Sequence, residues 1–295
     1  MSNATIRIIG LTKHYGAKAA LSGVDLDVPA GSFFAVLGPN GAGKTTLMRC
    51  LTGMIRPDGG SGTVLGVPLG PGYPPLPLKS RIGYVAQAQS LFERMTPREL
   101  IALCRGVQPR WDQKIIDRYM ELFRLPPNQI VRHMSAGMRA QLALTLVMGG
   151  TPELLILDEP TLGLDPLNRY QYLQVLLSDS IETGCTVLLS SHDLHQIERL
   201  ADRVAVLVEG RVVVTGTVDD LKLNERRLRV AGNVPAATLL AVPGVRRAVK
   251  ESGGWLLYAN GELPAMEATI RSLTGVTGLQ VFDQSLEEIF LSYVS

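Results

Sequence analysis

The chain of 295 residues is about twice as long as a typical domain, which predicts one large domain and one smaller domain. Its 29 basic and 27 acidic residues leave a formal net charge of +2, too small a surplus for a surface that follows a nucleic-acid backbone. The mean hydropathy of +0.16 is slightly apolar, yet no run approaches the ~18 apolar residues of a membrane-spanning helix. We therefore expect a chain that does not itself cross a bilayer and has no nucleic-acid partner.

The number and spacing of the cysteines indicate the cellular compartment of the protein. Cys50, Cys104 and Cys185 lie far apart and form no CxxC pair, which argues against a disulfide framework and against a zinc site. The amino terminus shows no basic segment followed by an apolar one, so no secretory signal is expected. Both features favour reduced thiols in a cytoplasmic protein.

The first half of the chain predicts short strands, a glycine-rich turn and then helices. Strands are expected at residues 6–9, 24–28 and 33–37, with a helix at 46–51 after the turn. The density of glycine and proline over residues 57–77 predicts a hairpin followed by a surface loop. Residues 96–148 show helical periodicity, and Thr-Pro-Arg-Glu at 96–99 matches a capping box with proline at the first helical position.

The sequence of the second half predicts two regions with different orders of strands and helices. Apolar runs at 154–157, 186–189 and 204–208 alternate with helical stretches near 168–181 and 195–201, an order typical of a parallel sheet in an α/β fold. Beyond residue 224, strands are expected at 228–231, 245–249, 255–259 and 279–282, with helices at 236–241 and 264–273. This βαββαβ order suggests a ferredoxin-like appendage. We therefore predict a first domain over residues 1–223 and an accessory domain over 224–295.

The strongest motif is the sequence GPNGAGKTT, which matches G-x-x-x-x-G-K-[ST] between a predicted strand and a predicted helix. Its glycines let backbone N–H groups converge on phosphate oxygens, Lys44 reaches the β- and γ-phosphates, and Thr45 offers a hydroxyl to Mg²⁺. The candidate nucleotide-binding residues are Gly38, Pro39, Asn40, Gly41, Ala42, Gly43, Lys44, Thr45 and Thr46.

A pair of carboxylates ends the apolar run at 154–157. Because side chains alternate along a strand, Asp158 and Glu159 are expected to diverge and to serve two roles. We expect Asp158 to hold Mg²⁺ through its water shell and Glu159 to polarise the water that attacks the γ-phosphate. Taken alone, such a pair is often a solvated cap; beside the phosphate loop it predicts a hydrolytic site.

With these motifs, the chain resembles the ATPase subunit of an ATP-binding cassette (ABC) transporter over about residues 5–220. The resemblance implies a P-loop NTPase fold of the ABC type: a RecA-like core, an antiparallel β subdomain, a helical subdomain at about 88–150, and a small α+β C-terminal domain. It also implies that Tyr15 stacks on adenine, that Gln87 senses Mg²⁺ and the γ-phosphate, and that His192 is the switch histidine. Asp165 matches the loop that follows the two carboxylates.

The signature segment of the family departs from its usual LSGGQ sequence. Met134, Ala136 and Met138 replace family residues, whereas Ser135 and Gly137 remain. The resemblance implies that Ser135 and Gly137 contact the γ-phosphate held by a second subunit. The Gly-Met-Arg version at 137–139 resembles ABC-2-type exporters, and so does the tail at 285–291. In these exporters the extra C-terminal domain contributes to dimerisation or regulation. In the tail, Leu286, Ile289 and Phe290 are expected to point inward.

The resemblance implies ATP and Mg²⁺ as cofactors and two protein partners. One is a second ATPase subunit, identical or different, and the other is a separate transmembrane permease that would hold the chain on the inner face of the cell membrane. The coupling helix of the permease is expected near Gln87 and the segment Ser90 to Arg98, where Leu91 and Phe92 are expected to be exposed.

Three other functions are weighed against an exporter ATPase. A soluble ABC ATPase acting on ribosomes or DNA usually carries two cassettes or a coiled-coil insertion, and this sequence shows one cassette and no heptad run. A catalytically silent module would lack Lys44, Glu159 or His192, and all three are in place. An importer ATPase is the nearest alternative, although the signature and the tail argue against it. The resemblance implies that the permease, rather than this chain, contacts the transported substrate.

Overall fold

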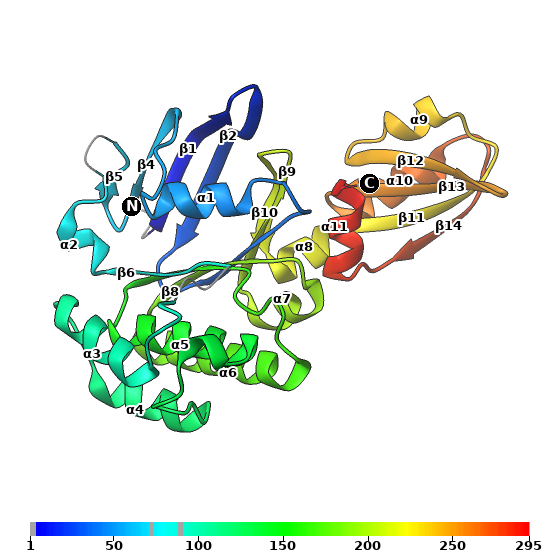
Figure 1. The fold of residues 1–295 in the computed structure, drawn as a ribbon. Coiled ribbons are helices and arrows are strands. Elements are labelled where there is room, and N and C mark those ends of the chain that lie inside the picture. The colour runs from blue at the N-terminus through cyan, green and yellow to red at the C-terminus, as the bar shows by residue number, and fades with distance from the viewer. Residues whose placement is uncertain (1–3, 71–72, 88–90, 295) are drawn as a thin grey trace. The chain divides into compact units, whose positions relative to one another are not determined.

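The computed structural model describes residues 4–70, 73–87 and 91–294 (Figure 1). The chain divides into two compact units, Met1–Val214 and Thr215–Ser295. The boundary expected at residue 224 is therefore too late. Helix α8 (Val218–Asn224) leads directly into strand β11 (Glu225–Gly232) and contacts helix α11 (Leu286–Val294), so it belongs to the second unit.

A six-stranded sheet forms the centre of the first unit, in the order β10-β9-β3-β8-β7-β6. Its strands are β3 (Phe33–Leu37), β6 (Ile82–Val85), β7 (Leu154–Asp158), β8 (Thr186–Ser191), β9 (Arg203–Val208) and β10 (Arg211–Thr217). The pairs that join β9, β3, β8, β7 and β6 are all parallel. β3, β7 and β8 are buried along their whole length, as the apolar runs predict for strands covered on both faces.

Helices cover both faces of this sheet. Helix α1 (Lys44–Leu51) lies on one face, and α5 (Ala136–Gly149) and α6 (Pro166–Thr183) lie on the other (Figure 1). The short helix α7 (Leu194–Leu200) contacts β3. The α/β fold expected from the sequence is confirmed.

An antiparallel sheet packs over α1, in the order β2-β1-β4-β5. Its strands are β1 (Ala4–Tyr15), β2 (Lys18–Pro29), β4 (Gly59–Val64) and β5 (Val67–Pro68). β1 and β2 are longer than the expected strands because they pair along nearly their whole length. The expected hairpin is β4 and β5, and part of the expected surface loop is instead the short helix α2 (Leu76–Lys79).

The helical part of the first unit contains α3 (Pro97–Val107), α4 (Gln113–Leu122), a 3₁₀ turn η1 (Val131–His133) and α5. The expected start of this subdomain, residue 88, lies outside the described residues. The capping box is confirmed: Thr96 Oγ1 accepts from Glu99 N at 3.3 Å, and Glu99 Oε2 accepts from Thr96 N at 2.7 Å. Among the described helices, none combines the length and apolar character needed to cross a membrane.

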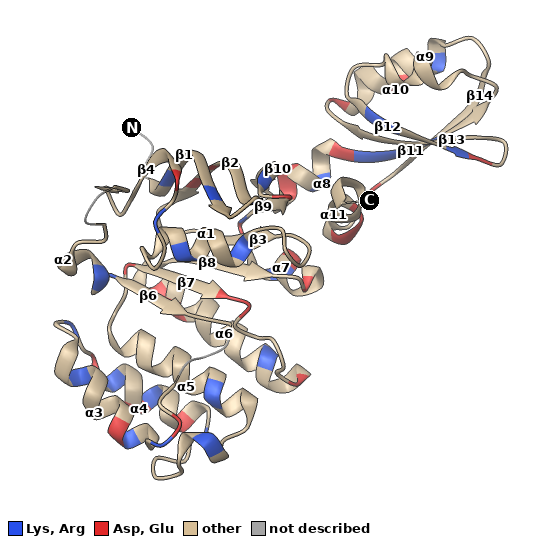
Figure 2. Ribbon diagram, turned by 45° about the horizontal axis from the view of Figure 1, so that its top comes forward, with Lys and Arg blue, Asp and Glu red and all other residues tan. Residues whose placement is uncertain are grey.

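The second unit is a four-stranded antiparallel sheet with helices. After α8, its elements are β11, α9 (Ala236–Leu240), β12 (Val245–Glu251), β13 (Gly254–Asn260), α10 (Leu263–Ser272), β14 (Val276–Phe282) and α11. The order β12-β13-β11-β14 is the order of a split βαβ arrangement. Leu228, Leu257 and Ile270 belong to its buried core, and basic residues lie along β11 and β12 (Figure 2). In α11, Leu286 and Ile289 are buried as expected, whereas Phe290 is only half-buried.

Candidate active site

Three loops meet at one edge of the central sheet. In the parallel register Leu37 pairs with Ser191, and Asp158 pairs with Ser190, so β3, β7 and β8 end side by side. The phosphate loop follows β3, Glu159 follows β7 and His192 follows β8. The carboxyl edge of an open α/β sheet is the usual position for a ligand. Motifs separated by more than a hundred residues in the sequence are thus brought together.

The phosphate loop folds closely around its lysine. Lys44 Nζ donates to the carbonyl oxygen of Gly38 at 2.6 Å, and the lysine side chain is almost fully buried. Gly43 has a φ of 109°, and a Cβ on it would lie 2.4 Å from the carbonyl oxygen of Ala20. Only glycine fits such a position. Helix α1 begins directly after it, at Lys44 rather than at residue 46, and no side chain caps its first N–H groups.

Glu159 occupies the middle of the site. Its Oε1 atom lies 3.5 Å from Lys44 Nζ, and its Oε2 atom lies 2.7 Å from His192 Nδ1. The Glu159 carboxylate is buried, whereas 56% of the His192 side chain is exposed. The expected reason for the divergence of Asp158 and Glu159 is wrong. Strand β7 ends at Asp158, and Glu159 follows it in the left-handed region with a φ of 48°, so strand alternation does not set its direction.

Asp158 directly precedes Glu159, and among the described residues only one of its two carboxylate oxygens has a hydrogen-bond partner. Ser190 Oγ donates to Asp158 Oδ1 at 2.7 Å and accepts from Glu159 N at 3.0 Å. Asp158 Oδ2 is buried and has no hydrogen-bond partner among the described residues. Sequence reasoning missed Ser190. The available signal was two serines at the end of an otherwise apolar strand.

A cavity of about 280 Å³ opens at this edge and collects most of the predicted residues. It is lined by Tyr15, Lys18, Ala20, Pro39, Asn40, Gly41, Ala42, Gly43, Lys44, Thr45, Thr46, Gln87 and Glu159. Tyr15 is half exposed, and Lys13 Nζ lies 5.8 Å from its ring centroid. Lys18 and Ala20 were not predicted. They follow the turn after Tyr15, and only the pairing of β1 with β2 brings them to the cavity.

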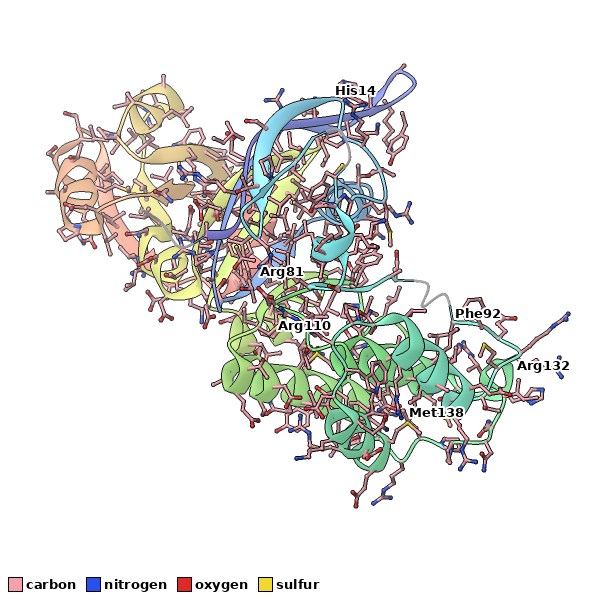
Figure 3. All side chains as sticks on the ribbon, turned by 90° about the vertical axis from the view of Figure 1, so that its left-hand side faces the viewer. His14, Arg81, Phe92, Arg110, Arg132 and Met138 are labelled. Atoms are coloured by element: carbon pink, nitrogen blue, oxygen red, sulfur yellow. The ribbon has the colours of Figure 1, made fainter. Side chains whose placement is uncertain are left out.

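Ser135, Gly137 and Asp165 do not line this cavity. Ser135 is the N-cap of α5 and accepts from Met138 N at 3.1 Å, and Asp165 is the N-cap of α6. A Cβ on Gly137 would lie 3.7 Å from Asn168 Nδ2, which itself donates to Asp165. Figure 3 shows Met138 among the helices of the first unit. The signature segment and the loop after Glu159 therefore pack against each other, separately from the cavity.

An apolar groove of about 620 Å³ lies between β6, α3 and α5. Its lining includes Met54, Leu91, Phe92, Leu103 and Val147. Phe92, labelled in Figure 3, is 63% exposed as expected, whereas Leu91 is half-buried. Ser90, the first residue of the expected contact segment, lies outside the described residues.

A glycine-rich loop between a buried parallel strand and a helix, with two carboxylates at the end of another strand of the same sheet, defines a P-loop nucleotide-binding protein. The sequence profile of the ABC transporter family matches residues 21–162. The daunorubicin resistance ATP-binding protein DrrA3 of Streptomyces coeruleorubidus is 36% identical, and the alignment covers 99% of this chain and 96% of that protein. The Nod factor export ATP-binding protein I of Rhizobium sp. (strain N33) is 35% identical, with coverage of 99% and 97%.

Solved structures agree with the fold. An ATP-binding subunit of an ABC transporter has a TM-score of 0.67 and 29% identity, and the match covers 74% of this chain and 92% of that chain. A dimeric ATP-binding cassette bound to ADP and Pi has a TM-score of 0.66 at 21% identity, over 72% of this chain and 98% of that chain, and shares the fold. The chain belongs to the family of ATP-binding subunits of ABC transporters, whose activity is ATP hydrolysis.

Proposed function

We propose that this chain is the ATPase subunit of an ABC-2-type exporter and powers a separate transmembrane permease through ATP-dependent closure of a dimer. Two relatives that align over nearly the whole chain are named as ATP-binding proteins, one of daunorubicin resistance and one of Nod factor export. The observation that carries the hydrolytic part of the proposal is the buried Glu159 carboxylate, held between Lys44 and His192 beside the phosphate loop.

Glu159 is the proposed general base. Its left-handed backbone directs the carboxylate toward Lys44, and the 2.7 Å contact with His192 fixes one of its oxygens. A base that abstracts a proton must reach the attacking water directly, and Glu159 lines the cavity. His192 would orient the carboxylate and the water together. Tyr15, at the cavity rim, would stack on the adenine, and the phosphate loop and Lys44 would hold the phosphates.

The residues around Asp158 fit a magnesium ion. Asp158 Oδ2 is a buried carboxylate oxygen without a partner among the described residues, and Thr45 and Gln87 line the adjoining cavity. Mg²⁺ prefers oxygen ligands and keeps several waters, which suits one carboxylate, one hydroxyl and one amide oxygen. A bound ion would neutralise charge that develops on the phosphates during transfer.

A second subunit would complete each site. Ser135 and Gly137 lie outside the cavity of their own chain, and the exposed Ser135 begins helix α5. In a head-to-tail dimer, the Ser135 hydroxyl and the N–H groups at the start of this helix would contact the γ-phosphate of the opposing site. Asp165 would lie at the same interface between the two subunits. The second unit would contribute to dimerisation or regulation, in a homodimer or a heterodimer on the inner face of the membrane.

The apolar groove beside Phe92 is the proposed contact for the permease. An exposed aromatic ring at the rim of an apolar groove suits an amphipathic helix from a partner. The experiment is affinity purification of the tagged chain from membranes of the cells that produce it, followed by identification of the permease that co-purifies. We expect Phe92→Asp to lose the permease and Val107→Asp, at an even more exposed apolar position outside the groove, to keep it. Purification of the unaltered chain without any permease would overturn the exporter assignment.

A further inference from the structure

Arg169, near the start of α6, joins two loops that the proposed function assigns to different tasks. Arg169 Nη1 donates to Asp193 Oδ2 at 2.7 Å, and Asp193 directly follows His192 in the chain. Arg169 Nη2 donates to the carbonyl oxygen of Leu164 at 3.3 Å, in the loop that leads from Glu159 to α6. One guanidinium group thus holds the loop of His192 and the loop of Asp165 at a fixed separation.

The neighbouring residue, Asn168, continues this connection to the signature helix. Gln141 of α5 is buried, and its Nε2 atom donates to Asn168 Oδ1 at 3.0 Å. Asn168 Nδ2 donates to Asp165 Oδ2. A Cβ on Gly137 would lie 3.6 Å from Leu164 Cδ2, so the signature segment also rests directly on the same loop. An unbroken series of contacts therefore runs from α5 through the start of α6 to the residue beside His192.

We propose that Arg169 is a positioning residue that couples the two ATP sites of the dimer. This inference rests on the proposed function, in which each subunit contributes Glu159 and His192 to one site and Ser135 and Gly137 to the other. When the signature segment engages the nucleotide of the opposite site, the start of α6 and Arg169 transmit its position to His192 of the subunit's own site. Hydrolysis at one site thereby depends on occupation of the other.

The chemistry of arginine explains why this residue suits the role. A guanidinium presents donors in a rigid planar fork, so the carboxylate of Asp193 and the carbonyl of Leu164 can be held together by one group. Lysine has a single compact cation and cannot keep both acceptors in that geometry. Arg169 Nε is buried without a hydrogen-bond partner among the described residues, so the two outer nitrogens make the contacts on which the coupling depends.

The test measures ATP hydrolysis by the full chain against ATP concentration, at chain concentrations where specific activity has become constant, so that dimer assembly does not contribute to cooperativity. The unaltered chain should show a Hill coefficient above one, toward the limit of about two set by two sites. Arg169→Lys should lower the Hill coefficient to about one. It should also lower kcat by roughly ten- to a hundredfold, with half-saturating ATP changed little, because misplacement of a catalytic group acts on kcat.

Arg118→Lys is the matched control. Arg118, in α4, forms an ion pair with Asp179 of α6, the helix that carries Arg169, but it has no contact with either loop among the interactions described. It should keep the Hill coefficient and kcat. Arg169→Ala should behave as Arg169→Lys does, with a lower melting temperature. If Arg169→Lys keeps the parental Hill coefficient, or if the unaltered chain hydrolyses ATP without cooperativity, the coupling role is wrong while the proposed function stands. A chain with no ATPase activity would overturn both.

Discussion

His192 Nδ1 lies 2.7 Å from Glu159 Oε2, at the point where β8 and β7 end next to each other. The two residues are 33 positions apart in the sequence, and their contact depends on the parallel pairing of two buried strands. Because Glu159 is also 3.5 Å from Lys44, one carboxylate connects the phosphate loop with the end of β8. Substitutions of Lys44, Glu159 and His192 should therefore each affect a different step.

Glu159→Gln should retain ATP and stop hydrolysis. Glutamine has nearly the same shape but cannot take a proton from water, so we expect hydrolysis to fall by at least about a hundredfold. The variant should accumulate as a closed dimer with ATP, which size-exclusion chromatography with mass detection would register as a doubled mass. Release of phosphate at the parental rate would exclude Glu159 as the base.

Lys44→Ala should weaken ATP binding itself. A hydrogen bond to a charged group contributes about 1.5–3 kcal/mol, so the affinity should fall by at least about tenfold in isothermal titration calorimetry. Lys79→Ala is a suitable control, because Lys79 is an exposed lysine in α2 that does not line the cavity. Equal affinity in the two variants would contradict the phosphate-loop assignment.

Ser135→Arg should separate binding from hydrolysis. Ser135 is exposed and does not line the cavity, so ATP affinity should be unchanged. The larger side chain should block the approach of a second subunit, and the rate of ATP hydrolysis should fall to background. Ser135→Ala keeps the backbone donors and loses only the hydroxyl, so it should give an intermediate rate. Full activity in the arginine variant would rule out the signature contact between subunits.

Glu153 should make the stability of the first unit depend on pH. Arg81 Nη2 and Arg110 Nη1 lie 2.7 Å and 2.8 Å from its carboxylate oxygens (Arg81 and Arg110 are labelled in Figure 3). The hydrogen bond from Arg81, aided by Arg110, holds the pKa of Glu153 below its ordinary value of 4.5. A carboxyl whose pKa is lower in the folded state stabilises the fold above pH 4.5 and loses that contribution as the pH falls through its folded pKa.

The measurement compares the parent with Glu153→Gln in urea unfolding. A Trp255→Phe background leaves Trp111 as the fluorescent reporter, so the signal comes from the first unit. The parent should be more stable near neutral pH by at most about 1 kcal/mol per pair, since these pairs are partly exposed. The difference should vanish at acidic pH. A difference that persists in acid would contradict the prediction.

Local sequence signals predicted the elements that carry the site. The apolar runs at 154–157 and 186–189 predicted the buried strands β7 and β8, because strands covered on both faces cannot alternate with polar residues. The Thr96 capping box predicted the start of α3, since the cap and its partner are three residues apart. Such features depend only on neighbours in the chain.

The positions that were missed depend on distant partners. Ser190 contacts Asp158 only because β8 pairs with β7 in a particular register. The unexpected direction of Glu159 follows from its left-handed backbone after the strand end. The proline that follows it, Pro160, does not indicate this conformation, because a residue before proline favours extended backbone. The domain boundary moved because α8 contacts α11, a helix more than sixty residues further along the chain.

The sequence by itself determined the class of chemistry, because the phosphate loop, the two carboxylates and the histidine are defined by residue type and short-range spacing. Tertiary structure alone decided which of these groups share a site. It gathered Tyr15, Lys44, Gln87 and Glu159 around one cavity and left Ser135 outside it. The physical reason is that strand register and helix packing fix distances between segments remote in the sequence, and no local pattern encodes those distances.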